Sequence, residues 1–344
     1  MRAAVMHSFS SPLSIETVDD PVVAPDGAVV RVLATGVCRS DWHGWMGHDA
    51  SIELPHVPGH ELCGEIVEVG PEVHGFAVGD RVTVPFCCGC GVCEPCRLGE
   101  TQVCERDVQP GFTIWGSFAE LVALPKADLN LVRVPDALSS VDAASLGCRF
   151  MTAWAALHVH AGVRAGEWVA VHGCGGVGLA AVMIAAAAGA QVIAVDLDEA
   201  KLARARALGA VAGVSSDVVE SIVELTGGGA HVSLDALGSP VTCVNSVTCL
   251  RRRGRHAQVG LLLGDQARVD VPMGRVIGRE LQVLGVHGMA VRHYDSMLRA
   301  VASGAVSPGE LVAKTISLEE VGDEVASMGS FAQEGVTVVV PGNG

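Results

Sequence analysis

The first part of the chain alternates short apolar runs with residues that favour turns. The runs Ala3–Met6, Leu13–Val18 and Ala28–Leu33 are separated by Ser-Ser-Pro, Asp-Asp-Pro and Pro-Asp-Gly. This pattern predicts short strands joined by tight turns. Because it continues through Glu61–Val69 and Arg81–Val84, the sequence up to about residue 145 is predicted to be mostly β.

Beyond Leu146 the pattern changes, and strand candidates alternate with longer helical candidates. In chain order these are Phe150–His160, Trp168–His172, Val177–Ala188, Gln191–Val195, Glu199–Leu208, Val218–Leu225, His231–Asp235, Val241–Leu250, Gly254–Gly260 and Leu281–Val286. Such alternation is typical of a parallel sheet with crossover helices. The tail from Tyr294 is predicted as helix, loop, helix and a final strand over Gly335–Val340. The sequence therefore predicts a β-type N-terminal domain around an inserted α/β unit.

Composition narrows the class of protein. A chain of 344 residues is too long for one ordinary core, so two domains are expected. The hydrophobic fraction of 49% favours a densely packed enzyme over a disordered chain. The net charge of −15 disfavours a nucleic-acid partner, because phosphate backbones repel an acidic protein. It does not exclude a dinucleotide, which backbone amides at a helix N-terminus can hold.

The location of the protein is inferred from its apolar runs and its cysteines. No apolar run at the N-terminus is long enough for a signal peptide, and the longest run, Leu179–Ala188, is too short to span a membrane. We therefore expect a cytoplasmic protein with no membrane partner. In that compartment twelve cysteines favour metal ligation over disulfides.

A glycine motif follows the apolar strand Val169–Val171. Gly173, Gly175 and Gly178 form Gly-x-Gly-x-x-Gly before an Ala-rich helix, and the next predicted strand ends in Asp196. This context predicts a dinucleotide site with the phosphates at the helix N-terminus, although a chain with 42 glycines also produces structural glycine turns. A carboxylate at Asp196 accepts hydrogen bonds from ribose hydroxyls and repels a 2′-phosphate, which favours NAD over NADP.

Four cysteines with short spacings form the clearest metal motif. Cys90, Cys93, Cys96 and Cys104 follow one another at intervals that allow four thiolates to converge on a tetrahedral zinc. An iron–sulfur site is the rival interpretation, and the spacing of the fourth cysteine disfavours it. A closed four-thiolate site has no open position, so its predicted role is structural.

A second group of polar side chains lies between Val37 and Glu61. It offers one thiolate, one hydroxyl, two carboxylates and two imidazoles, on Cys38, Ser40, Asp41, His43, His60 and Glu61. These are the groups that a zinc ion and a proton relay require. Taken singly they have plainer interpretations: a small buried cysteine, a helix-capping serine and a half-exposed loop histidine.

With these parts assembled, the chain resembles the zinc-dependent alcohol dehydrogenases of the medium-chain dehydrogenase/reductase superfamily. The most specific match is Gly59–Val73, which follows the zinc signature of that family throughout. The resemblance implies a GroES-like, mostly β catalytic domain over 1–148 and 288–344. Inserted in it is a Rossmann domain over 149–287, with a doubly wound parallel sheet that binds NAD.

The resemblance also implies roles for individual residues. Cys38, His60 and Cys148 would bind the catalytic zinc, with Glu61 as a nearby carboxylate and Asp41 holding His60. Ser40 and His43 would carry the proton to solvent. The implied cofactor contacts are Arg39, Thr152, Gly173, Gly175, Gly176, Val177, Gly178, Asp196 and Lys201. The implied substrate-pocket residues are Phe86, Phe112 and Trp115.

The implied activity is the reversible oxidation of an alcohol to an aldehyde or ketone, with NAD and two zinc ions per chain. Other zinc enzymes of the superfamily, acting on polyols, threonine or a formaldehyde adduct, are the main alternatives. Cys148 points away from the polyol enzymes, which often use Glu as the third ligand. A zinc-free double-bond reductase and a non-catalytic NAD-binding protein are more distant alternatives. The family also implies a homodimer or homotetramer.

Overall fold

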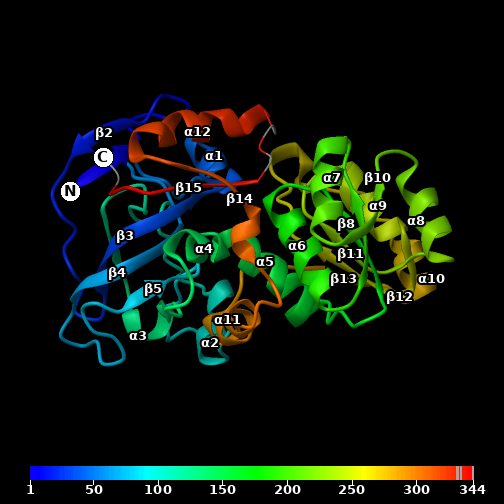
Figure 1. Ribbon diagram of the computed structural model, residues 1–344, viewed down its shortest axis with the longest axis horizontal. Helices are drawn as coiled ribbons and strands as arrows, with labels where there is room; N and C mark the ends of the chain where they lie inside the picture. Colours follow the sequence, from blue (N-terminus) through cyan, green and yellow to red (C-terminus); the bar gives the residue numbers. More distant parts are fainter. Residues whose placement is uncertain (331–332, 334, 343–344) are drawn as a thin grey trace. The chain divides into compact units, whose positions relative to one another are not determined.

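The computed structural model describes residues 1–330, 333 and 335–342. The chain forms two compact units (Figure 1). Unit 1 comprises Met1–Met151 and Gly288–Gly344, and unit 2 comprises Thr152–His287. Among the described residues, no helix combines the length and the apolar character needed to cross a membrane.

Unit 1 is built on a seven-stranded sheet in the order β14-β15-β3-β4-β5-β7, with β6 also paired to β3. Its strands are β3 (Ala28–Val37), β4 (Glu61–Val69), β5 (Arg81–Thr83), β6 (Leu121–Leu124), β7 (Val132–Arg133), β14 (Val312–Ile316) and β15 (Val336–Val339). A separate hairpin pairs β1 (Arg2–Val5) with β2 (Ser14–Thr17). Val30, Ile66 and Val82 belong to the buried apolar cluster of the sheet. The predicted β character of this region is thus confirmed.

The register of β3 and β4 positions the residues of interest. The two strands are antiparallel, and Gly36 near the end of β3 lies opposite Glu61 at the start of β4. The two chain segments that leave the sheet here carry Cys38 and His60. The pairing therefore brings together residues that the sequence separates by a long loop.

Short helices complete unit 1. They are α1 (Arg39–Trp45), α2 (Glu94–Arg97), α3 (Ala127–Asn130), α4 (Ser140–Ala144), α11 (Tyr294–Ala302) and α12 (Val321–Ser327). A helical segment over Leu146–Phe150 continues through α5 (Met151–Trp154) to Ala155–His160, so the chain passes from unit 1 to unit 2 within it. This segment begins before the predicted Phe150, and Gly147 interrupts it with φ −53° and ψ −150°.

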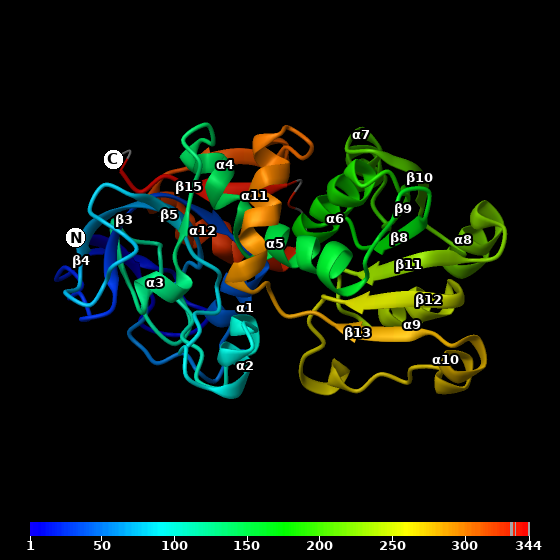
Figure 2. The ribbon, with the colours of Figure 1, turned by 90° about the horizontal axis from the view of Figure 1, so that it is seen from below.

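Unit 2 contains a six-stranded parallel sheet in the order β10-β9-β8-β11-β12-β13. Its strands are β8 (Trp168–His172), β9 (Gln191–Val195), β10 (Ala210–Val214), β11 (Ala230–Asp235), β12 (Leu250–Gln258) and β13 (Gln282–Gly285). Its helices are α6 (Gly176–Ala187), α7 (Glu199–Ala207), α8 (Val218–Thr226), α9 (Pro240–Thr248) and α10 (Met273–Arg279). Figure 2 shows β8, β11, β12 and β13 side by side. The predicted doubly wound parallel sheet is confirmed.

Some elements differ from the prediction. Strand β12 begins at Leu250, four residues before the predicted Gly254, and includes the charged run Arg251–Arg253. Strand β10 has the sequence Ala-Val-Ala-Gly-Val, whose small side chains give little strand signal. Helix α10 and strand β14 were also not expected, and three of the five side chains of β14 are exposed. Short elements with few buried side chains lack the apolar periodicity on which the prediction depends.

Candidate active site

Four potential metal ligands meet in unit 1. One ligand atom each from Cys38, His60, Glu61 and Cys148 lies within 4.8 Å of all the others. The end of β3 supplies Cys38, the start of β4 supplies Glu61 with His60 directly before it, and the kinked segment Leu146–Phe150 supplies Cys148. Three distant parts of the chain therefore contribute to one cluster.

Asp41 organises two of these ligands. Its Oδ1 accepts hydrogen bonds from His60 Nδ1 at 2.9 Å and from the Gly59 amide at 3.1 Å, and its Oδ2 accepts from the Cys38 amide at 2.8 Å. With its proton on Nδ1, His60 presents a lone pair at Nε2. That atom is buried and has no hydrogen-bond partner among the described residues. A buried acceptor in this state fits a metal ion, which would use the lone pair.

The chemistry of the Cys38 thiol also fits a metal. A hydrogen bond with the Cys148 thiol holds the pKa of Cys38 well below its usual range, against the opposing effect of burial. The thiolate is the form of cysteine that binds zinc. Two thiols and one imidazole form a donor set typical of catalytic zinc sites in alcohol dehydrogenases.

Arg149 is a member of the site that the sequence analysis missed. Its backbone amide and its Nε each donate to Glu61 Oε1 at 3.1 Å, its Nη2 pairs with Glu61 Oε2, and its Nη1 donates to the Val37 carbonyl at 2.9 Å. Both side chains are buried. Burial raises the pKa of Glu61 to about 7, and the charge of Arg149 acts in the opposite direction. The only signal in the sequence is an arginine beside a predicted ligand in an otherwise apolar segment.

The two predicted relay residues lie on α1. Ser40 and His43 are three residues apart on the helix and so share a face. Ser40 Oγ lies 3.7 Å from Cys38 Sγ, and His43 Nδ1 lies 3.0 Å from His48 Nδ1. Burial, then Arg39 and His48, lower the pKa of His43 to about 4. The pairing with His48 was not anticipated, because α1, the helix that carries His43, was not among the predicted elements.

Two of the three predicted pocket residues lie beside His60. The ring centroids of Phe112 and Phe86 are 5.3 Å and 6.3 Å from that of His60. Both phenylalanines are buried. Trp115 is 38% exposed, and its Nε1 donates to the Pro55 carbonyl. The structure therefore places Phe86 and Phe112 beside the four potential metal ligands and Trp115 at the surface.

In unit 2 each glycine of the predicted cofactor motif has a distinct environment. Gly173 has φ +91°, which permits the tight turn after β8. A Cβ at Gly178 would overlap the Gly173 carbonyl, so α6 can approach the turn only with glycine there. Gly175 has open space around its missing side chain, and Gly176 begins α6. These are the three roles that the dinucleotide fingerprint assigns to its glycines.

Asp196 follows β9 and faces the same loop. Its Oδ2 accepts from the Cys174 amide at 2.7 Å and its Oδ1 accepts from the Asp198 amide at 3.1 Å. These bonds fix the carboxylate beside the glycine turn. A carboxylate has about four lone-pair positions, so it retains capacity for ribose hydroxyls.

The remaining predicted cofactor contacts lie on separate elements. Thr152 lies on α5, Val177 on α6 and Lys201 on α7. Arg39 begins α1, where its Nη1 donates to the Met328 carbonyl at 2.8 Å and its guanidinium lies 4.7 Å from the centre of the Trp42 ring. Each of these four residues therefore lies on a helix of known bounds.

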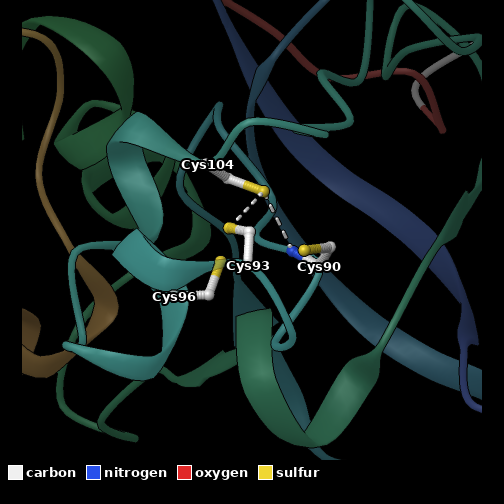
Figure 3. Close-up of side chains that lie close together, drawn as sticks. All are labelled: Cys90, Cys93, Cys96 and Cys104. Atoms are coloured by element: carbon white, nitrogen blue, oxygen red, sulfur yellow. Dashed lines mark hydrogen bonds between the residues drawn. The ribbon is translucent and has the colours of Figure 1, made fainter.

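The four-cysteine loop forms a second metal-binding cluster in unit 1 (Figure 3). Cys90, Cys93, Cys96 and Cys104 lie with their sulfur atoms within 4.8 Å of one another. The amides of Cys90 and Arg106 each donate to Cys104 Sγ at 3.3 Å. Amides of Val92 and Cys93 lower the pKa of Cys90 to about 6. Four thiols with backbone donors around them fit a structural zinc, with every ligand supplied by the protein.

Comparisons with known proteins agree with this geometry. Residues 24–136 match the alcohol dehydrogenase GroES-like domain, and residues 176–303 match the zinc-binding dehydrogenase family. An alcohol dehydrogenase of Geobacillus stearothermophilus is 34% identical over 94% of each chain. An NAD-dependent alcohol dehydrogenase of Sulfurisphaera tokodaii is 32% identical over 99% of this chain and 100% of its own.

A solved structure extends the comparison. The zinc-binding dehydrogenase of Sinorhizobium meliloti with bound NADP superposes with a TM-score of 0.90, at 30% identity over 99% of each chain. The two domain matches, the whole-length relatives and the fold lead to one conclusion. The chain belongs to the zinc-dependent alcohol dehydrogenases of the medium-chain dehydrogenase/reductase superfamily.

Proposed function

We propose that Cys38, His60 and Cys148 hold the catalytic zinc of an NAD-dependent alcohol dehydrogenase. This proposal rests on one observation: His60 Nε2 is buried and has no hydrogen-bond partner among the described residues. It faces a cluster with two thiols, while Asp41 accepts the Nδ1 proton on the other side of the ring. The reaction is the reversible oxidation of an alcohol to an aldehyde or ketone.

When bound, zinc supplies a Lewis acid that lowers the pKa of an alcohol hydroxyl, and NAD supplies the hydride acceptor. The chain's own residues then orient the ligands and move the proton. Asp41 fixes the tautomer and direction of His60. Ser40 Oγ takes the proton of the alcohol as it gives up its own hydroxyl proton, and His43, neutral above about pH 4, takes up the released proton and passes it towards solvent. Phe86 and Phe112 supply the apolar wall beside the reacting groups.

We assign the NAD site to unit 2. Gly175 leaves room for the pyrophosphate, and the N-terminus of α6 provides amide donors. Asp196 accepts from the ribose hydroxyls and repels a 2′-phosphate. Thr152, Val177 and Lys201 of unit 2 are assigned as further cofactor contacts, and the cofactor contact of Arg39 stays a prediction from the family resemblance. On this assignment unit 1 is the catalytic domain and unit 2 the NAD-binding domain.

Asp196→Ala tests the cofactor assignment. The KM for NAD is expected to rise about tenfold while the KM for the alcohol stays within about twofold, because one charged hydrogen-bond acceptor is lost. The preference for NAD over NADP should fall at the same time. An unchanged KM for NAD would contradict the role of Asp196.

We also propose that the chain assembles into a homodimer or homotetramer through β13. This strand is last in the order of its sheet, and its side chains are largely exposed. Val283 is 47% exposed, and Ile277 on the neighbouring α10 is 74% exposed. Apolar side chains on an unpaired edge favour pairing with a second copy.

Six thiols in ligand positions also require a reducing compartment, which supports a cytoplasmic location.

Two measurements on the purified protein test the proposed function. Metal analysis should give two zinc ions per chain, one for each cluster. The absorbance of NADH should rise in the presence of NAD and a primary or secondary alcohol, with polyols and threonine as comparison substrates. One zinc per chain, or turnover confined to polyols, would contradict the proposal.

A further inference from the structure

Glu61 is paired with Arg149, and its carboxylate would also lie within reach of a metal ion held by Cys38, His60 and Cys148. Its carboxylate is close enough to act as a ligand, since one of its oxygens lies within 4.8 Å of the ligand atoms of Cys38, His60 and Cys148. Arg149 nevertheless engages both oxygens, with two donors to Oε1 and one to Oε2. A forked guanidinium–carboxylate pair of this kind is among the stronger polar contacts in proteins.

Arg149 is itself fixed by its surroundings. Its Nη1 donates to the carbonyl of Val37, the residue before Cys38, and its own backbone follows Cys148. One side chain therefore connects the two segments that carry the thiol ligands. Because the guanidinium is planar and held at three points, Glu61 cannot turn towards the metal while this arrangement persists.

Two glycines leave little alternative space for the pair. A Cβ at Gly36 would overlap the Glu61 carboxylate, and a Cβ at Gly147 would overlap the Glu61 side chain near its backbone. The backbone of β3 and the kink at Gly147 thus pack directly against Glu61 and Arg149. Breaking a buried pair in such a site leaves an uncompensated charge, so the paired state dominates at rest.

We infer that Arg149 is a positioning residue that keeps the Glu61 carboxylate out of the ligand set, so that the fourth position stays free for the alcohol. This inference rests on the proposed zinc site. A merely structural role for Arg149 predicts the opposite change in how tightly the site holds zinc. Loss of a structural arginine loosens the site, whereas release of Glu61 adds a ligand and tightens it.

The test is Arg149→Lys, measured by the rate at which zinc passes to a coloured chelator. Lysine keeps the charge, but a single ammonium cannot fork to Glu61 and also reach Val37. Zinc release should slow about tenfold and kcat should fall about tenfold, since residues around metal ligands typically change affinity or activity by that amount. Release at the wild-type rate or faster would overturn the inference. The double variant Arg149→Lys/Glu61→Gln should recover wild-type release, because an amide is a poorer ligand.

Glu61→Gln provides a second test that does not depend on the folding of the lysine variant. If Arg149 keeps Glu61 out of the ligand set, this change alters the zinc release rate by no more than about tenfold, as is typical of a residue beside the ligands. Much faster release would show Glu61 to be a resting ligand and would overturn the inference. The zinc content of the wild-type protein is the separate measure of the proposed function, so the two failures are distinguishable.

Discussion

The two cysteine-containing clusters of unit 1 contrast in how they are assembled. The four-cysteine loop takes all its ligands from one short segment, Cys90–Cys104, and backbone amides in this segment and just after it donate to Cys104 Sγ. The other cluster joins the end of β3, the start of β4 and the kinked segment after α4. One of its four potential ligands, Glu61, is held by a buried arginine. A site whose four ligands all come from one loop stabilises that loop. A site that must bind substrate has to keep one coordination position free, and here the folded sheet would hold the other ligands in place.

The largest expected effect is that of Cys38→Ser. Loss of one thiolate from the proposed catalytic cluster, which consists of Cys38, His60, Glu61 and Cys148, should lower kcat by about a thousandfold or more, because Lewis-acid activation of the alcohol is lost. NAD binding, measured by fluorescence titration, should change little. Cys63→Ala is the matched control, since Cys63 is equally buried but belongs to neither cluster. Retained turnover in Cys38→Ser would show that neither of the two clusters is needed for the chemistry.

Asp41→Asn tests how strongly the catalytic cluster depends on groups that do not bind the metal. An amide can present its nitrogen to His60 and disturb the tautomer, so kcat should fall about 10–100-fold with zinc bound less tightly. Asp49→Asn, in an exposed turn of the following loop, is the control and should behave as wild type. Equal effects of the two changes would argue against the orienting role.

His43→Gln tests the connection of the catalytic cluster to solvent, which the four-cysteine loop does not need. At pH 7 kcat should fall about tenfold, and added imidazole should restore part of it. Burial lowers the pKa of His43 to about 4, so the wild-type relay should fail only as the pH falls through about 4. The unfolded chain binds this proton more readily, so His43 also reduces stability between about pH 6.5 and 4. A kcat that is unchanged at pH 7 would exclude His43 from the relay.

Cys93→Ser should have the smallest effect on the chemistry and a clear effect on stability. The zinc content should fall from two ions to one, and the melting temperature should drop by about 5 °C or more as the loop loses its metal. Limited proteolysis should then cut within Cys90–Cys104. Cys87→Ser is the control, because Cys87 lies nearby but outside the cluster. If the variant lost its activity while the loop still resisted proteolysis, the proposal that the four-cysteine loop has only a structural role would be wrong.

The same contrast explains what could be predicted from sequence. The short spacing of the four cysteines already shows that their thiols can meet, so this cluster could be predicted without knowledge of the fold. The strands β4, β8 and β9 have the predicted bounds, because each is a short, largely buried apolar run bounded by turn or polar residues. Cys148 could be connected to Cys38 only through a family resemblance, since no local rule relates positions so far apart in the chain.

The residues that were missed share a physical reason. Arg149 acts through contacts with a distant segment, and His48 acts through a contact with His43, five residues before it; propensity and periodicity report neither. Helix α1 was not among the predicted elements because it is short and contains a glycine and two tryptophans. It forms because Asp41 accepts from the Cys38 amide and so stabilises the first turn.

The position of Asp41 has a consequence for how this protein can evolve. The same carboxylate caps α1 and orients His60. A substitution at this position is therefore selected against twice, once through the stability of the folded unit and once through turnover. A lineage that abandoned the metal would keep Asp41 under selection for folding long after His60 had drifted, and a descendant enzyme could regain the ligand by a single change at His60.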